Sequence, residues 1–236
     1  MRAAIFIDGA YVLSQFKQHN IYPDYSAFET YLLKPLRRTT TLDLLRCYFY
    51  YCAPWMSAEP SEDEKRRMKE HEEFMHEIKS VERWAVRLGK LQKRRDGNRD
   101  YYEQKRVDVL LSVDMVRHSA AGHIQHAILV AGDSDFIPAV EAAKESGATV
   151  SLWCSDDSTV HKDLIELADV VNRFDWKFFP KLKGKKLKEA EAHDEQRIKS
   201  INEQRMNRNN NKKLEHNKVE AVPDNPRKGL FSRLSK

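Results

Sequence analysis

Short apolar runs and amphipathic stretches take turns along the first three-quarters of the chain. Strands are predicted where the runs are short, apolar and rich in β-branched or aromatic residues, at 3–7, 42–52, 127–131, 149–154 and 170–174. Helices are predicted where apolar residues recur at three- and four-residue steps, at 11–18, 25–38, 61–84, 107–120, 136–146 and 159–169. Residues 86–106 are less regular and indicate a strand or a hairpin around Asp96-Gly97. This alternation predicts an α/β domain with a largely parallel sheet over residues 1–180.

Local signals define several helix ends. Ser61 and Glu64 form a predicted capping box at the start of the 61–84 helix. Pro138 lies in the first turn of the 136–146 helix and Gly147 lies just beyond its end. The 107–120 segment is apolar on nearly all sides, so we expect this helix to be buried.

Carboxylates follow two of the predicted strands. Asp8 ends the first apolar run, and Asp133 and Asp135 stand in the GDSD turn after residues 127–131. Ligands of parallel sheets bind outside the carboxyl ends of the strands, so these side chains would converge if the two strands were neighbours. Clustered carboxylates repel each other unless a cation neutralises them, and hard oxygen ligands favour Mg²⁺ or Mn²⁺. The pattern therefore predicts a divalent metal site.

Three further residues have two interpretations each. Asp108 begins the 107–120 helix and is interpreted as a fourth metal ligand or as a helix cap. Asp114 lies about 120° further around that helix, so it is a weaker candidate, which supports a ligand or pairs with Arg117. Ser134 is expected to cap the following helix, with a hydrogen bond to a metal-bound carboxylate as the alternative.

Charge changes the picture beyond residue 180. Residues 181–236 hold 16 Lys and Arg against 8 Asp and Glu, a net charge of +8, whereas residues 1–180 hold 25 against 28, a net charge of −3. The tail has few large apolar residues, so we expect it to be flexible, either disordered or partly helical. Basic tails often bind nucleic acid electrostatically, and a solubilising extension is the alternative.

A second basic stretch lies within the domain and carries two tyrosines. Such a stretch could grip the phosphates and stack the bases of a single strand, whereas an ordinary solvated loop is the alternative. The residues concerned are Lys93, Arg94, Arg95, Arg99, Tyr101, Tyr102, Lys105 and Arg106.

The composition of the chain indicates where in the cell the protein is expected. Three cysteines without a C-x-x-C spacing indicate neither a disulfide framework nor a structural zinc site, so a reducing cytoplasm is the expected location. The apolar stretch 3–7 is interrupted at once by Asp8, which does not fit a signal peptide. No run approaches the roughly 18 apolar residues of a membrane span, so no membrane partner is expected.

Three ordered blocks of sequence resemble a known family. The blocks FIDGAYVL, KRVDVLLSVDM and ILVAGDSDFIPAVEAAKESGATVSLW are similar to the LabA-like branch of the NYN domain family, within the PIN-like nucleases. The resemblance covers about residues 1–175. It implies a Rossmann-like, PIN-like three-layer sandwich with a mostly parallel central sheet.

The resemblance also implies an activity. It implies a Mg²⁺- or Mn²⁺-dependent ribonuclease that acts on RNA, with catalytic and metal-binding positions that match Asp8, Asp108, Asp133 and Asp135. One position departs from the family, because Tyr11 stands where an Asn near the metal is usual, and a phenol cannot copy the paired donor and acceptor of an amide. A module that binds RNA or a protein partner with weak or no catalysis is therefore the alternative function. A homo-oligomer is also left open.

Other folds that gather aspartates at strand ends fit less well. A receiver domain requires an acidic pair after its first strand, and a haloacid-dehalogenase phosphatase requires D-x-D-x-T there, whereas this chain has DGAYV. The glycine-rich nucleotide-binding motifs G-x-x-x-x-G-K-[ST] and G-x-G-x-x-G do not occur.

Overall fold

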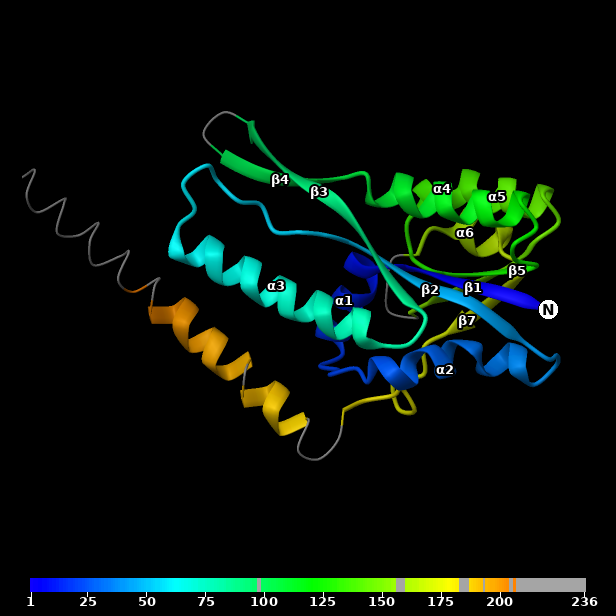
Figure 1. The fold of residues 1–236 in the computed structure, drawn as a ribbon, viewed down its shortest axis with the longest axis horizontal. Coiled ribbons are helices and arrows are strands. Elements are labelled where there is room, and N and C mark those ends of the chain that lie inside the picture. The colour runs from blue at the N-terminus through cyan, green and yellow to red at the C-terminus, as the bar shows by residue number, and fades with distance from the viewer. Residues whose placement is uncertain (97–98, 156–159, 183–186, 193, 204–205, 207–236) are drawn as a thin grey trace, which may run out of the picture. The chain divides into compact units, whose positions relative to one another are not determined.

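The computed structural model describes residues 1–96, 99–155, 160–182, 187–192, 194–203 and 206 (Figure 1). The chain divides into a compact unit of residues 1–182 and a second unit of residues 183–236. The described strands of the first unit are β1 (Arg2–Asp8), β2 (Asp43–Cys52), β3 (Trp84–Asp96), β4 (Arg99–Lys105), β5 (His126–Val130), β6 (Thr149–Cys154) and β7 (Val170–Arg173). Its described helices are α1 (Gly9–Gln18), α2 (Tyr25–Arg37), α3 (Glu62–Ser80), α4 (Val107–Ala120), η1 (Ser134–Phe136), α5 (Ile137–Glu145) and α6 (Lys162–Leu167).

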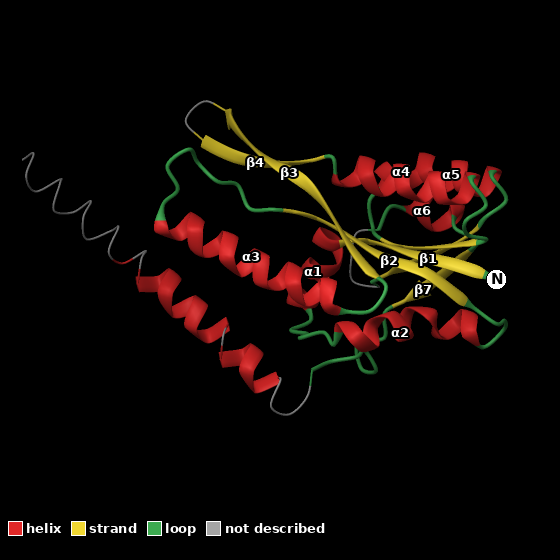
Figure 2. Ribbon diagram, in the orientation of Figure 1, coloured by secondary structure: helices red, strands yellow, loops and turns green. Residues whose placement is uncertain are grey.

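These strands form one sheet in the order β4-β3-β2-β1-β5-β6-β7. The six strands from β3 to β7 across the sheet run parallel, and β4 pairs antiparallel with β3 as a hairpin. Helices α1, α2 and α3 cover one face, and α4, α5 and α6 cover the other (Figure 2). The α/β, Rossmann-like sandwich expected from the sequence is therefore confirmed.

The register of the central strands brings the sequence motifs together. Strand β1 pairs on one side with β5, with Ile7 opposite Val130, and on the other with β2, with Asp8 opposite Tyr50. The carboxyl ends of β1 and β5 are therefore neighbours, which was the condition for the aspartates to converge. This edge of the sheet is where parallel α/β folds bind ligands.

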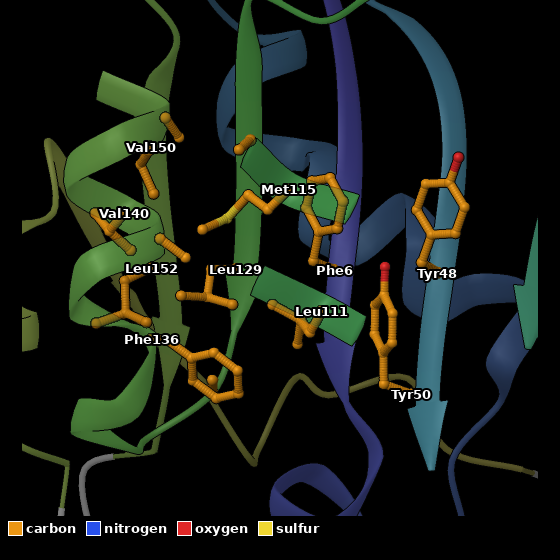
Figure 3. Close-up of a cluster of buried hydrophobic side chains, with 14 of the residues drawn as sticks. Phe6, Tyr48, Tyr50, Leu111, Met115, Leu129, Phe136, Val140, Val150 and Leu152 are labelled. Atoms are coloured by element: carbon orange, nitrogen blue, oxygen red, sulfur yellow. The ribbon is translucent and has the colours of Figure 1, made fainter. Parts of the chain in front are cut away.

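Two apolar cores hold the sheet between its helical layers. Alternate residues of β1 point to opposite faces, so Phe6 packs with Tyr50, Leu111 and Met115 under α4 (Figure 3). Ile5 and Ile7 join the other core, under α1, α2 and α3. Side chains along β1 from Ala3 to Ile7 are fully buried, so the strand that carries Asp8 is fixed on both faces.

The helices match the sequence signals with three differences. Ser61 and Glu64 form the predicted capping box. Helix α3 ends at Ser80 rather than at residue 84, and α6 covers only six of the expected eleven residues. The expectation that α4 is buried on nearly all sides is wrong, because the sheet covers only its inner face, and Val109 and Val113 are 63% and 55% exposed.

The first unit extends to residue 182. The backbone N–H of Leu182 donates to the carbonyl of Tyr22 at 2.8 Å, and Lys181 forms a bridge with Pro23. In the second unit, the described residues 187–192 and 194–203 are helical. None of the helices in the described ranges has the length and apolar character that a membrane crossing requires.

Candidate active site

Asp8 is held at the junction of β1 and α1. It is the last residue of the strand and the N-cap of the helix, and its Oδ1 accepts hydrogen bonds from the backbone N–H groups of Ala10 (3.0 Å) and Tyr11 (3.3 Å). The side chain is half-buried. The cap therefore fixes one carboxylate at the carboxyl edge of the sheet.

Asp133 organises the turn after β5. Its Oδ1 accepts from the backbone N–H of Asp135 at 3.1 Å and caps the short helix η1. The expectation that Ser134 caps the following helix is wrong, because Asp133 caps η1 and the cap position of α5 is Phe136, which makes no side-chain cap hydrogen bond. The Ser134 hydroxyl instead donates to the carboxylate of Asp133, at 3.4 Å from its Oδ1. Both aspartates of the turn are exposed.

Asp108 reaches the same edge from α4. The helix begins after Arg106, whose φ of 76° is left-handed, and this cap position makes no side-chain hydrogen bond. Interpreting Asp108 as the helix cap is therefore wrong. Its carboxylate is half-buried, and its pKa is raised by burial and then by the charges of Asp133 and Asp135.

The four carboxylates lie close enough for their charges to influence one another. The pKa of Asp8 is raised from 3.8 to about 6, mainly by burial and also by the charges of Asp108 and Asp133, while the hydrogen bonds from the backbone N–H groups of Tyr11 and Ala10 oppose this shift. Within the described ranges, none of the four carboxylates forms an ion pair with a Lys, Arg or His. The edge therefore concentrates negative charge that the described residues leave uncompensated.

This donor set fits a hard divalent cation. Carboxylate oxygens are the ligands that Mg²⁺ and Mn²⁺ prefer. As the side chains stand, no three His, Cys, Asp or Glu residues in the described ranges already form a metal-binding group. Asp133 and Asp135 are exposed, and exposed side chains change rotamer within nanoseconds, so both can turn toward an ion.

Tyr11 fastens α1 to the neighbouring strand ends. Its hydroxyl accepts a hydrogen bond from the backbone N–H of Ser155 at 2.9 Å, just after β6. Its ring lies against Gly132, where an added Cβ would meet the Tyr11 Cε2 atom at 2.6 Å. The residue that departs from the family pattern therefore braces the loop that carries Asp133.

An open pocket of about 980 Å³ lies beside these carboxylates. Asp8, Tyr11, Asp133 and Ser134 are among its lining residues, whereas Asp108 and Asp135 are not. Sequence analysis missed the rest of the polar wall. It consists of Ser14, Gln15 and Gln18 from α1, and of His161, Lys162 and Asp163 at the start of α6.

A backbone contact explains how α6 enters the site. The N–H of His161 donates to the carbonyl of Gly132 at 3.2 Å, which ties the start of α6 to the turn after β5. No sequence motif signals a contact of this kind. The part of the wall on α1 could have been found from the sequence. Its residues are spaced so that they share one helix face: Tyr11, Ser14, Gln15 and Gln18.

Asp114 has its own partners on the sheet side of α4. Its carboxylate accepts from Arg117 (3.1 Å), from Arg87 on β3 (3.2 Å) and from the Tyr50 hydroxyl (3.0 Å). The residue is buried, with 8% of its surface exposed. The pairing with Arg117 expected as one alternative is thus present, within a larger network.

The basic stretch forms the hairpin of β3 and β4. In the backbone register, Lys93 lies opposite Tyr102 and Arg94 lies opposite Tyr101. Arg94 and Arg106 are exposed. The side chains of the other candidate contacts lie outside the described residues: Lys93, Arg95, Arg99, Tyr101, Tyr102 and Lys105.

Comparison with known proteins supports the fold and identifies the family. A crystal structure of a protein of unknown function from Vibrio parahaemolyticus is 22% identical, with a TM-score of 0.52, and the match covers 75% of this chain and 95% of that one. Acinetobacter baumannii MurG is 12% identical with a TM-score of 0.36, covering 77% and 43%. No curated protein matches. The NYN domain model matches residues 2–174, and the chain therefore belongs to the NYN domain family, a PIN-like nuclease family.

Proposed function

We propose that this protein is a divalent-metal-dependent ribonuclease that hydrolyses phosphodiester bonds of single-stranded RNA. The observation that carries this proposal is the convergence of Asp8, Asp108, Asp133 and Asp135 at one edge of the sheet. They come from β1, α4 and the turn after β5, and the pKa values of two of them are raised in part by the charges of the others. Membership of a nuclease family supports the same chemistry.

The four carboxylates would hold Mg²⁺ or Mn²⁺. Such an ion supplies Lewis-acid chemistry, lowering the pKa of a water molecule and offsetting charge on the reacting phosphate. Asp8 is positioned for a ligand because the start of α1 fixes one of its oxygens. Ser134 orients the Asp133 carboxylate through its hydroxyl. A nucleophilic Ser-His or Cys-His pair is not required for this reaction class.

The family favours RNA as the substrate, and the cationic groups near the edge suit the phosphates of a nucleic-acid strand. Lys162 lines the pocket, and Arg94 and Arg106 are exposed on and beside the hairpin. Positive side chains along a groove retain the backbone of a single strand. Cys47, Cys52 and Cys154 are buried and have no C-x-x-C spacing, which supports action in the reducing cytoplasm.

The second candidate is a binding module of the same fold without turnover. Tyr11 favours it, because the phenol that replaces the family's Asn is engaged with Ser155 and Gly132. Such a protein would bind RNA or a protein partner and leave it intact.

Cleavage of a labelled single-stranded RNA separates these candidates. Wild type, Asp133→Asn and Asp43→Asn are compared with Mn²⁺, with Mg²⁺ and with EDTA. Asp43 is the matched control, since it is an exposed carboxylate that starts β2 at the opposite edge and pairs with Arg2 at 2.8 Å. We expect metal-dependent cleavage by wild type and Asp43→Asn, and loss of at least about a hundredfold in Asp133→Asn.

The other outcomes decide against the nuclease. Binding of RNA without cleavage in all three proteins would leave the binding module. Equal cleavage by wild type and Asp133→Asn would place the activity elsewhere or in a contaminant.

A further inference from the structure

The pocket extends beyond the carboxylates along one face of α1. Tyr11, Ser14, Gln15 and Gln18 follow each other at three- and four-residue steps and all line the pocket. From Tyr11 to Gln18 this face rises about 10 Å along the helix axis, at roughly 1.5 Å per residue. The site therefore has a polar wall that the carboxylate chemistry does not use.

Gln15 is the unusual residue of this wall. Only 5% of its surface is exposed, and its Oε1 atom has no hydrogen-bond partner among the described residues. Its amide nitrogen makes a single long hydrogen bond to the Ser14 hydroxyl, at 3.4 Å. Buried carbonyl oxygens in proteins are nearly always paired, and an unpaired one destabilises the fold. The neighbouring buried positions of α1, Val12 and Phe16, are apolar and avoid this cost.

We propose that Gln15 is the acceptor of a nucleotide-binding subsite next to the carboxylate edge, an inference that rests on the proposed function. Gln15 lines the pocket, so a ligand bound in the pocket can supply a partner for its oxygen. A carbonyl oxygen accepts hydrogen bonds from N–H and O–H groups and cannot bind a phosphodiester, which offers acceptors only. The ligand group is therefore an N–H of a base edge or the 2′-hydroxyl of a ribose.

The rest of the lining suits the other parts of a nucleotide. Lys162 is exposed and supplies a cation for phosphate. Asp8 and Asp133 would repel a phosphate without a metal, so Lys162 and Gln15, rather than these carboxylates, hold the strand. The carboxylates then act on the phosphodiester that lies beside the bound nucleotide.

The test is the substitution Gln15→Leu in the full chain, with Gln125→Leu as its matched control. Gln125 is a glutamine at the opposite edge of the sheet, and its oxygen is paired with the backbone N–H of Arg2 at 2.8 Å. Binding is measured by fluorescence anisotropy in EDTA, with labelled single-stranded oligomers of U, C and A as RNA and as DNA. Thermal unfolding is measured on the same proteins.

We expect Gln15→Leu to weaken RNA binding about tenfold without lowering the melting temperature, because the substitution removes an unpaired buried oxygen. Gln125→Leu should do the reverse, leaving binding unchanged and lowering stability slightly. A loss confined to RNA assigns the 2′-hydroxyl as the donor, and a loss that follows the base in both RNA and DNA assigns the base edge.

Three results would overturn the subsite. They are unchanged binding in Gln15→Leu, a loss of binding that only accompanies a loss of stability, or no binding of any oligomer by wild type. Cleavage by wild type with Mn²⁺ is scored separately. Cleavage without an effect of Gln15→Leu rejects the subsite alone, whereas a binding defect without any cleavage by wild type rejects the nuclease alone.

Discussion

At the scale of single residues, the carboxylates at the sheet edge differ in what fixes them. Asp8 is the most constrained, because it ends a buried strand and caps α1. Its pKa of about 6 records how strongly burial and neighbouring aspartates oppose its charge. Asp133 and Asp135 are exposed and can adapt. We propose that one fixed carboxylate beside two exposed ones suits a site that closes when a cation enters.

The raised pKa of Asp8 predicts how stability depends on pH without metal. The folded state holds the Asp8 proton up to about pH 6, whereas the unfolded chain releases it near 3.8, so the free energy of unfolding falls as pH rises through this window. Asp8→Asn keeps an N-cap acceptor but removes the charge. In EDTA at pH 7.5 it should be more stable than wild type by on the order of 2 kcal/mol, at about 1.4 kcal/mol per pKa unit.

Urea unfolding of both proteins at pH 4, 6 and 7.5 checks this sign. The difference between Asp8→Asn and wild type should vanish near pH 4. Asp43→Asn is the control with the opposite trend, because the hydrogen bond from Arg2 lowers the pKa of Asp43. If Asp8→Asn were less stable than wild type at pH 7.5, the surroundings of Asp8 would not disfavour its charged carboxylate, which contradicts the raised pKa.

Substitution of Asp114 should reduce the stability of the protein rather than its activity. Its carboxylate is buried and accepts from Arg87, Arg117 and Tyr50. Asp114→Asn should lower the free energy of unfolding by about 1–2 kcal/mol, a discounted value because both arginines remain largely exposed. Cleavage with saturating Mn²⁺ should stay within about twofold of wild type. A hundredfold loss of cleavage in a folded protein would instead give Asp114 a place at the metal.

At the scale of elements, the contact between α1 and the turn after β5 controls the geometry of the site. The ring of Tyr11 fills the space where a side chain at Gly132 would stand. The φ of Gly132 is not in the left-handed region, so the backbone alone would accept alanine. The close approach of Tyr11 is therefore the reason that glycine is needed there.

Gly132→Ala should displace Tyr11 and with it the turn that carries Asp133. We expect a loss of about 1–3 kcal/mol in stability and a fall in cleavage of about tenfold or more, because overpacking forces neighbouring atoms to move. The double variant Gly132→Ala with Tyr11→Asn should recover stability relative to the sum of the single changes, since the ring that clashes is gone. Thermal unfolding and single-turnover cleavage of the four proteins measure this coupling. Additive effects would contradict the contact.

The elements also show what the sequence can and cannot predict. Apolar runs that end in Asp8 or in the GDSD turn predict the strands and their carboxylates, because short buried strands have a clear local pattern. The adjacency of β1 and β5 is nonlocal, since β1 lies between β2 and β5. Because α4 is apolar on nearly all sides, its sequence does not indicate which face packs on the sheet. The exposure of Val109 and Val113 therefore could not be foreseen. The contribution of α6 depends on one backbone hydrogen bond to Gly132.

At the scale of the whole molecule, charge is divided between the two units. Residues 183–236 hold 15 Lys and Arg against 8 Asp and Glu, a net charge of +7, and residues 1–182 hold 26 against 28, a net charge of −2. The acidic edge repels the backbone of RNA, so we propose that the tail compensates by binding phosphate groups through its lysines and arginines. The chain divides into two units after residue 182, and the first unit is compact by itself, so the tail can be removed to test this proposal.

Removal of residues 183–236 should lower the affinity for RNA and should also make that affinity less sensitive to salt concentration. Binding of a labelled single strand is measured between about 50 and 200 mM salt for the full chain and for a chain that ends at Leu182. The slope of log affinity against log salt should become shallower by about 0.7 for each tail phosphate contact that is lost. Cleavage at saturating RNA should be retained. An unchanged slope would show that the tail serves solubility instead.

Metal binding connects the scales, because one cation would offset the charges of four residues from three elements. An ion that binds only the folded state raises the free energy of unfolding by mass action, by about 2.7 kcal/mol at a hundredfold excess over Kd. Protons compete for Asp8, so the melting temperature gained with Mn²⁺ should be large at pH 7.5 and decline as pH falls through about 6. Asp133→Asn should lose most of this gain and Asp43→Asn should keep it. Differential scanning fluorimetry with Mn²⁺, Mg²⁺ and EDTA measures all three proteins, and an equal gain in Asp133→Asn would place the ion away from these carboxylates.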